Sequence, residues 1–267
     1  MSHRTVCNVV ILTLAFSVGY HIQRTSTYAA APVPQPAVLV ELFTSEGCSD
    51  CPPADQVLAQ LARNHLVDGA EVIAMSEHVD YWNRLGWSDP FSDAQFSNRQ
   101  NEYAHAFGRR DIYTPQMVVD GQIEFVGSNR GQALEAVARA AKNSKASLSI
   151  TRIKVDKETV RVRVGVNSVS GLTGAEPADV FLAITEDNLF SKVERGENRG
   201  RRLEHVAVVR KLTRIGKLSE GGTFNTEYVV PIARAWKRAD LRAVAFVQDN
   251  KDRRVLGVSS TPIEGLE

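Results

Sequence analysis

Two cysteines, Cys48 and Cys51, are separated by two residues. The almost entirely apolar residues 38–45 before them indicate a buried strand, and residues 53–64 after them carry their apolar side chains at helical spacing. At the start of a helix the two sulfurs reach each other across one turn, and the free N–H groups and positive dipole end stabilise a thiolate. The pattern predicts a redox pair in which an exposed Cys48 attacks a disulfide and Cys51 resolves the mixed intermediate.

A C-x-x-C pair has two other common uses, as zinc ligands or as a static disulfide that closes a turn. The chain has three cysteines and no second C-x-x-C, so a zinc site would need histidines or carboxylates from elsewhere. His78 follows a second apolar run, residues 71–76, at the end of the sheet where the cysteines are also expected. It is a candidate proton carrier, or a third ligand for copper, since thiolates and imidazole suit Cu(I). A packed, hydrogen-bonded histidine is the structural alternative.

Other polar residues have both a chemical and a structural interpretation. Glu41 interrupts an apolar strand, where a buried carboxylate titrates high and relays protons to the cysteines, or bonds to a neighbouring loop. Asp80 either orients His78 or caps a turn, and we favour the cap. Residues 191–202 are polar and basic, which indicates a solvated, mobile loop, and His205 after them has no evident partner.

The acids near the cysteines bear on the direction of electron flow. Glu46 and Asp50 each lie within two residues of Cys48, and no basic residue stands between the cysteines. Like charge disfavours a second anion, so these acids oppose a stabilised thiolate. We therefore expect a reductase or isomerase in preference to a primary oxidant.

An aromatic stretch follows the second apolar run. Residues 77–91 contain Tyr81, Trp82 and Trp87 among charged residues, without a period of 2 or 3.6. We interpret this stretch as a long loop that forms a wall or lid beside the cysteines. An aromatic plug that closes the core is the alternative.

The elements between residues 37 and 145 follow the order β-α-β-α-β-β-α. After the first helix and second strand we expect a helix over 92–107, capped by Ser92, a hairpin that begins after Pro115, and a helix over 130–143. This order predicts an α/β thioredoxin-like domain over residues 37–145. In such domains the position of Thr114-Pro115 holds a cis-proline beside the cysteines, so Pro115 joins the predicted site.

The pattern changes after residue 146. Arg161-Val162-Arg163-Val164 alternates strictly, which is typical of a strand with one exposed face. The spacing of turns predicts an all-β, sandwich-like domain over residues 146–267. Its expected strands are residues 147–155, 159–167, 179–185, 206–212, 223–231, 241–248 and 255–260.

Composition and the N-terminus narrow the class of protein. The 267 residues are 43% hydrophobic and 24% charged, as in globular proteins, and the formal charge of +1 gives no argument for nucleic acid as a partner. Arg4, the apolar residues 6–18 and three alanines at 29–31 predict a signal peptide over residues 1–31, and hence a secreted or periplasmic protein in which a disulfide persists. This apolar run is shorter than the about 20 residues of a membrane span, so no stable span is expected after cleavage, and an uncleaved anchor is the alternative.

Several stretches together resemble a family of bacterial secreted proteins of unknown function with a thioredoxin-like fold. The resemblance covers essentially the whole chain after residue 31, and it implies a fold and a location but no established reaction. The sequence departs from true thioredoxins because no Trp precedes Cys48 and the dipeptide is Ser49-Asp50. The matching stretches are V-E-L-F-T-S-E-G-C-S-D-C-P-P-A-D at 40–55, H-V-D-Y-W at 78–82, Y-T-P-Q at 113–116, Glu197-Asn198, Gly200-Arg201, His205 and Val208-Val209-Arg210.

Two functions of different class follow. The first is a cell-envelope thiol–disulfide oxidoreductase, a reductase or isomerase, that uses Cys48, Cys51, Pro115 and His78 without a cofactor. Its partners are a protein or small-molecule disulfide and a redox partner protein. The second is a copper-binding or interaction protein on the same scaffold, without catalysis.

Overall fold

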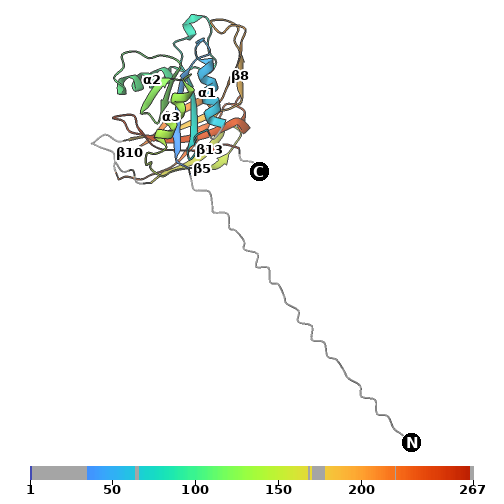
Figure 1. Cartoon of the computed structure of the whole chain (residues 1–267), viewed down its shortest axis with the longest axis vertical. Coiled ribbons are helices and arrows are strands. Elements are labelled where there is room, and N and C mark those ends of the chain that lie inside the picture. Colours follow the sequence, from blue (N-terminus) through green and yellow to red (C-terminus); the bar gives the residue numbers. More distant parts are fainter. Residues whose placement is uncertain (2–34, 64–65, 168, 170–177, 220, 265–267) are drawn as a thin grey trace. The chain divides into compact units, whose positions relative to one another are not determined.

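One eight-stranded mixed sheet organises the fold (Figure 1). The computed structural model describes Met1 and residues 35–63, 66–167, 169, 178–219 and 221–264. The signal peptide expected over residues 1–31 therefore lies, Met1 apart, outside the described residues. The strand order is β13-β12-β7-β10-β2-β1-β3-β4. The strands are β13 (Val255–Pro262), β12 (Leu241–Gln248), β7 (Ala178–Glu186), β10 (Val208–Leu218), β2 (Glu71–His78), β1 (Ala37–Thr44), β3 (Gln116–Val119) and β4 (Ile123–Val126).

Three helices cover the N-terminal half of this sheet. Helices α1 (Pro52–Arg63) and α3 (Arg130–Ala140) pack on one face, and α2 (Ala94–Ala106) packs on the other. The alternation of side chains along each strand decides which face a residue joins. On β1, Leu42 packs with α1 and α3, whereas Phe43 packs with α2. In the described part of the chain, no helix is long and apolar enough to span a membrane.

A second, three-stranded sheet covers the C-terminal half, and β5 lies against β13 (Figure 1). Val162 and Val164 from this sheet share a core with Leu182 of β7 and Ala245 of β12. The order of the second sheet is β11-β6-β5. Its strands are β5 (Leu148–Val155), β6 (Thr159–Val166) and β11 (Phe224–Pro231).

The separate sandwich expected after residue 146 is corrected by this topology. Two β layers do pack face to face, but one of them continues the N-terminal sheet. The junction is narrow: Val208 of β10 pairs in parallel with Ser76 of β2, and the Ser76 N–H donates to the Ala207 carbonyl at 2.8 Å. Residues 37–145 thus form part of a larger mixed α/β fold. Strand patterns establish which residues are buried, but they carry no information on which edge a strand joins.

Most expected elements are present, with two local corrections. Helix α2 is capped by Asp93, whose side chain accepts the Gln95 N–H, and not by Ser92. Residues 191–202, expected to form a solvated loop, belong to a hairpin of β8 (Leu189–Lys192) and β9 (Arg202–His205). These strands have four residues each, too few for the alternation of side chains to stand out.

A buried polar cluster lies on the α2 face. Arg99 Nε lies 2.6 Å from Glu41 Oε1 and 3.5 Å from Glu77 Oε1, and Tyr103 also donates to Glu41. One guanidinium therefore faces two carboxylates. Burial and the nearby Glu41 raise the pKa of Glu77 well above its ordinary value. Glu77 therefore keeps its proton to a higher pH than an exposed glutamate does.

We expect Glu77→Gln to stabilise the protein at neutral pH. Because the folded state holds the Glu77 proton more tightly than the unfolded state, stability is full below the unfolded pKa, about 4.3, and is lost as pH rises through the raised pKa. The loss is about 1.4 kcal/mol per pH unit between the two values. Urea unfolding between pH 4 and 8 should show the variant gaining over the parent as pH rises. Glu71→Gln, at an exposed position of the same strand, is the control. A variant less stable than the parent at pH 7 would contradict the assignment.

Candidate functional site

The cysteines lie where β1 turns into α1. Cys48 and Cys51 form a disulfide, and the Cys51 carbonyl accepts the N–H groups of Ala54 at 2.8 Å and Asp55 at 3.1 Å. Cys51 thus immediately precedes α1, with Pro52 in its first position, where a missing N–H is tolerated. The expected placement at the helix N-terminus is confirmed, and the role of the pair stays a prediction.

The exposed Cys48 expected from the sequence is not observed. Its exposed fraction is 1%, and that of Cys51 is 0%. Attack on a large substrate therefore requires a rearrangement around Cys48. The cysteine loop is contacted both by Trp82 and by residues from the other half of the chain, and no pattern next to the cysteines predicts these contacts.

The tip of the β8–β9 hairpin, residues 193–201, contacts the cysteine loop. The fully buried side-chain amide of Asn198 donates to the carbonyls of Glu46 at 2.9 Å and Cys48 at 2.8 Å. Beside it, the Ser49 N–H donates to Glu197 Oε2 at 3.0 Å. Residues about 150 positions away in sequence therefore close over the C-x-x-C loop.

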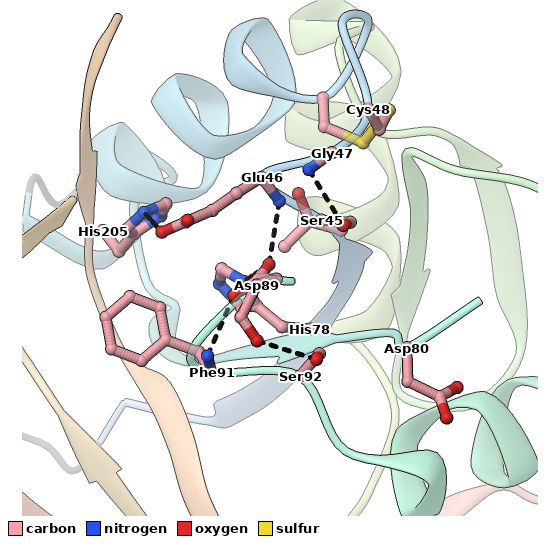
Figure 2. A network of polar contacts seen from close by, with 12 residues as sticks. Ser45, Glu46, Gly47, Cys48, His78, Asp80, Asp89, Phe91, Ser92 and His205 are labelled. Carbon is pink, nitrogen blue, oxygen red and sulfur yellow. Dashed lines mark hydrogen bonds and ion pairs between the residues drawn. A yellow bond between two sulfur atoms is a disulfide. The ribbon is translucent and has the colours of Figure 1, made fainter. Parts of the chain in front are cut away.

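Glu46 connects the cysteine loop to its surroundings. Its carboxylate lies 3.0 Å from His205 Nε2 and accepts the indole N–H of Trp87 at 2.7 Å. Figure 2 shows this side chain extending toward His205 and away from Cys48. Because its carboxylate faces an imidazole and an indole N–H, Glu46 opposes a Cys48 thiolate less than its position two residues before Cys48 suggests. Asp50, which is exposed, remains the acid between the cysteines.

His78 is oriented by Asp89. It lies at the end of β2 on the α1 face, and its Nδ1 is 2.7 Å from Asp89 Oδ2. Asp80 extends elsewhere (Figure 2) and accepts from Ser97 of α2, so it neither orients His78 nor caps a turn with its side chain in the described structure. The Asp89 side chain also accepts the backbone N–H groups of Glu46 and Phe91. These charge-assisted contacts lower the pKa of Asp89 against the effect of burial.

Two histidine–carboxylate pairs meet in the interior. The rings of His78 and His205 lie edge to face with centroids 5.0 Å apart, and Phe91 packs against both. Among the described residues, His78 Nε2 and His205 Nδ1 have no hydrogen-bond partner. His205, which had no evident partner in sequence, is therefore a buried member of the site.

Asp55 links these histidines to the cysteine helix. It stands one turn after Cys51 on α1, and the Thr44 hydroxyl donates to its carboxylate at 2.9 Å. Burial raises the pKa of Asp55, while His205 and His78 act in the opposite direction. Asp55 is the acid that sequence reasoning missed. The signal that could have identified it is its spacing of four residues from Cys51, which is one turn of a helix.

Glu41 does not serve the cysteines. It shares the face of Phe43, toward α2, and is bound to Arg99 and Tyr103. The first turn of α1 lies on the other face. The expected proton relay from Glu41 to the cysteines is therefore wrong, because the alternation of side chains along β1 directs Glu41 through the opposite side of the sheet.

The aromatic loop and Pro115 lie beside the same loop. The Thr114–Pro115 bond is cis, as expected. The indole N–H of Trp82 donates to Thr114 Oγ1 at 2.8 Å, and a Cβ placed on Gly47 would lie 3.1 Å from Trp82 Cβ. Trp82 thus spans the cysteine and Pro115 loops, while Tyr81 bonds to Gln100 of α2. A wall beside the cysteines is observed for the tryptophans, and its contact with a substrate stays a prediction.

A copper site at Cys48, Cys51 and His78 has no support in this geometry. Across the described ranges, no three His, Cys, Asp or Glu side chains are grouped so that they could hold a metal ion. While the sulfurs are joined to each other, neither is a thiolate ligand.

We expect Asp89→Asn to destabilise the protein by about 3–5 kcal/mol at pH 6, because it leaves a buried charged partner unpaired. Asp89 and neighbouring acids raise the pKa of His78 despite its burial. The contribution of His78 is full below its unfolded pKa, about 6.5, and is lost as pH rises through the raised value. That of Asp89 is lost as pH falls through its lowered value.

The parent–variant difference in unfolding free energy should therefore peak between about pH 4 and 6.5. Asp111→Asn, at an exposed position, is the control. A difference that does not vary from pH 4 to 9 would show that the pair is not charged.

Known structures share this fold. Protein AGR_C_4864 from Agrobacterium tumefaciens is similar with 23% identity and a TM-score of 0.64, over 88% of this chain and 98% of its own. HBP35 of Porphyromonas gingivalis is similar with 13% identity and a TM-score of 0.62, over 85% of this chain and 75% of its own. No curated protein matches the sequence. Residues 39–248 match the family described as protein of unknown function (DUF1223), and the chain belongs to that family.

Proposed function

We propose that this protein is a thiol–disulfide oxidoreductase of the cell envelope, built on a thioredoxin-like unit over residues 37–145. The observation that carries the proposal is the disulfide before the first turn of α1, with the partly buried acid Asp55 one turn further along the same helix. Exchange at a buried cysteine requires a group that takes and returns its proton. We assign this role to Asp55, because it stands on the turn of α1 that follows Cys51 and burial raises its pKa.

The arrangement of elements supports the thioredoxin-like interpretation. The unit β1-α1-β2 is parallel and β3-β4 is an antiparallel hairpin followed by α3, with α1 and α3 on the face that carries the cysteines. Pro115 stands immediately before β3, on the loop that Trp82 joins to the cysteine loop. Residues from 146 onward then supply the cover of the site and most of the remaining sheet.

In the proposed reaction the reduced pair transfers two electrons to a substrate disulfide. The Cys48 thiolate attacks one substrate sulfur, forms a mixed disulfide and releases the other substrate sulfur as a thiolate, which takes up a proton. The Asp55 carboxylate accepts the proton of the Cys51 thiol. The Cys51 thiolate then attacks the Cys48 sulfur, which restores the internal disulfide and expels the second substrate sulfur as a thiolate. This thiolate takes the proton that Asp55 holds and leaves as a thiol.

The two histidine–carboxylate pairs influence this chemistry through Asp55. His78 and His205 lie near Asp55 and lower its pKa through their charge, so they limit how strongly burial holds its proton. Their roles are to position and tune Asp55 and the cysteine loop. Nothing in the geometry brings either ring to the sulfurs, so His78 acts through its neighbours in this proposal.

The proposed direction of electron flow rests on Asp50, and the proposed location rests on the N-terminal signal peptide. Exposed Asp50 between the cysteines disfavours a strongly stabilised thiolate, so we propose a reductase or isomerase supplied with electrons by a partner protein. The proposed signal peptide over residues 1–31 places it in the periplasm or outside the cell. Recovery of the protein from the cytoplasmic fraction alone would contradict this location.

The activity is tested with purified protein. Reduction of insulin or isomerisation of scrambled ribonuclease, with dithiothreitol as electron source, should proceed above the uncatalysed rate. Cys48→Ser should abolish it, and Cys51→Ser should accumulate a mixed disulfide with the substrate, identified by mass spectrometry. Asp111→Asn, at an exposed position, is the control. Equal rates with and without the parent protein would reject the proposal.

Asp55→Asn separates the proton carrier from the nucleophile. We expect the resolution step to slow by about 100-fold or more, the usual scale for loss of a general base. The parent rate should rise with pH as Asp55 loses its proton through its raised pKa, and the variant should lack this rise. Asp68→Asn, at an exposed position, is the control. A pH profile that is unchanged in Asp55→Asn would remove Asp55 from the mechanism.

A further inference from the structure

We propose that the tip of the β8–β9 hairpin, residues 193–201, is a lid that keeps the disulfide closed and must swing away before the cysteines react. The purpose of this lid rests on the proposed function, whereas its existence does not. Its evidence is that Cys48 and Cys51 are buried and that residues distant in sequence are hydrogen-bonded to the backbone of the cysteine loop.

The lid is a preformed unit. Gly200 N–H donates to the Val193 carbonyl at 2.7 Å, and Val193 N–H donates to the Arg201 carbonyl at 3.0 Å, so the tip closes on itself. Gly196 and Gly200 have positive φ angles of 73° and 81°, which hold the tip in a tight turn. A unit with its own hydrogen bonds can move as one body, because opening it breaks only its outer contacts.

The contacts of the tip with the cysteine loop are polar and few, and elsewhere Gly196 packs beside Trp87. Asn198 bonds to the carbonyls of Glu46 and Cys48, and Glu197 accepts the Ser49 N–H. Ordinary hydrogen bonds contribute about 1 kcal/mol each to net stability, and segments held mainly by such bonds open far more readily than a packed core. The side chain of Val193 is buried but belongs to none of the three hydrophobic cores.

Asn198 is the latch. Both of its contacts on the cysteine loop are made by one side-chain nitrogen, and Arg201 Nη1 donates to its oxygen at 2.7 Å, which fixes the orientation of the amide. The strands behind the tip form a separate two-stranded sheet, and such a ribbon is only marginally stable alone. At its base, His205 is held by Glu46, which leaves a hinge between the anchored base and the latched tip.

Opening the lid prepares the cysteine loop for a polypeptide. The Ser49 N–H loses its bond to Glu197 and becomes a free donor. The Cys48 carbonyl loses its bond from Asn198 and can accept a second hydrogen bond beside the one from the Cys51 N–H at 3.3 Å. An extended chain offers both complementary groups at each residue. The lid therefore occupies the position that a polypeptide substrate would take, and the substrate must compete with it.

The test follows reduction of the internal disulfide in the full oxidised chain by dithiothreitol, with thiols counted by a chromogenic reagent. The parent should react much more slowly than the same chain in urea. Asn198→Ala should react about tenfold faster than the parent or more, because it loses the latch bonds. Asn198→Asp, which replaces the donor amide by a carboxylate facing two carbonyls, should also react faster. Arg199→Ala, exposed in the same tip, is the control and should match the parent.

Hydrogen exchange distinguishes lid opening from unfolding. In Asn198→Ala, faster exchange should be confined to the amides of residues 193–201 and of the cysteine loop. Faster exchange throughout β1 and β2 would show that the variant unfolds globally. The reduction rate of Asn198→Asp would then be compared with that of the parent at a urea concentration that gives the two the same unfolding free energy. Reduction of the parent as fast as the unfolded chain, or no acceleration in either variant, overturns the lid. Acceleration without catalysis of protein disulfide exchange would uphold the lid and reject the proposed function.

Discussion

The structure of the site depends on the requirement that a buried carboxylate be paired. Glu46 is 1% exposed and stands two residues before Cys48. Its charge is compensated by His205 and the Trp87 indole, while its main chain bonds to Asp89 and Asn198. An unpaired charge at this depth would be strongly destabilising. The carboxylate of Glu46 therefore needs both the aromatic loop, through Trp87, and the C-terminal hairpin, through His205, beside the cysteine loop.

The end of β2 separates two polar systems by one residue. His78 and Glu77 are neighbours in sequence, yet they face opposite sides of the sheet. His78 joins Asp89 on the cysteine side, and Glu77 faces Arg99 on the α2 side. Both systems are buried, but only the first connects to the cysteines through Asp55. Burial of a titratable group is thus no sign of function by itself. His78 and Glu77 are distinguished by the face of the sheet on which each side chain lies.

A closed disulfide is consistent with an enzyme that reacts only with selected partners. An open C-x-x-C pair in the cell envelope exchanges with any thiol it meets, whereas a covered one reacts when a ligand contributes the free energy of opening. The family to which the chain belongs has no assigned reaction. In this interpretation the C-terminal half gives the site its selectivity, because it supplies both the hairpin tip and the base that holds it.

The sequence by itself determined most of the elements and the position of the cysteine pair before the first helix. The apolar run of β1, the C-x-x-C spacing and the helical pattern of α1 are local features, and local features read directly from residue order. The position of His78 at the end of β2 also followed from strand direction, and the cis bond before Pro115 followed from the element order of a thioredoxin-like domain. For Glu41, in contrast, the sequence left a proton relay and a structural bond both open, because its partner Arg99 is 58 residues away.

Only the tertiary structure decided what surrounds the cysteines. Asn198 and His205 lie in short strands and turns without a periodic pattern, and their partners are about 150 residues earlier in the chain. The same holds for the joining of β10 to β2 through Val208 and Ser76, which made one sheet of two expected domains. Which edge of a sheet a strand joins depends on all the strands and helices that pack around it. The pattern of one strand shows which residues are buried but does not show which strand is its neighbour.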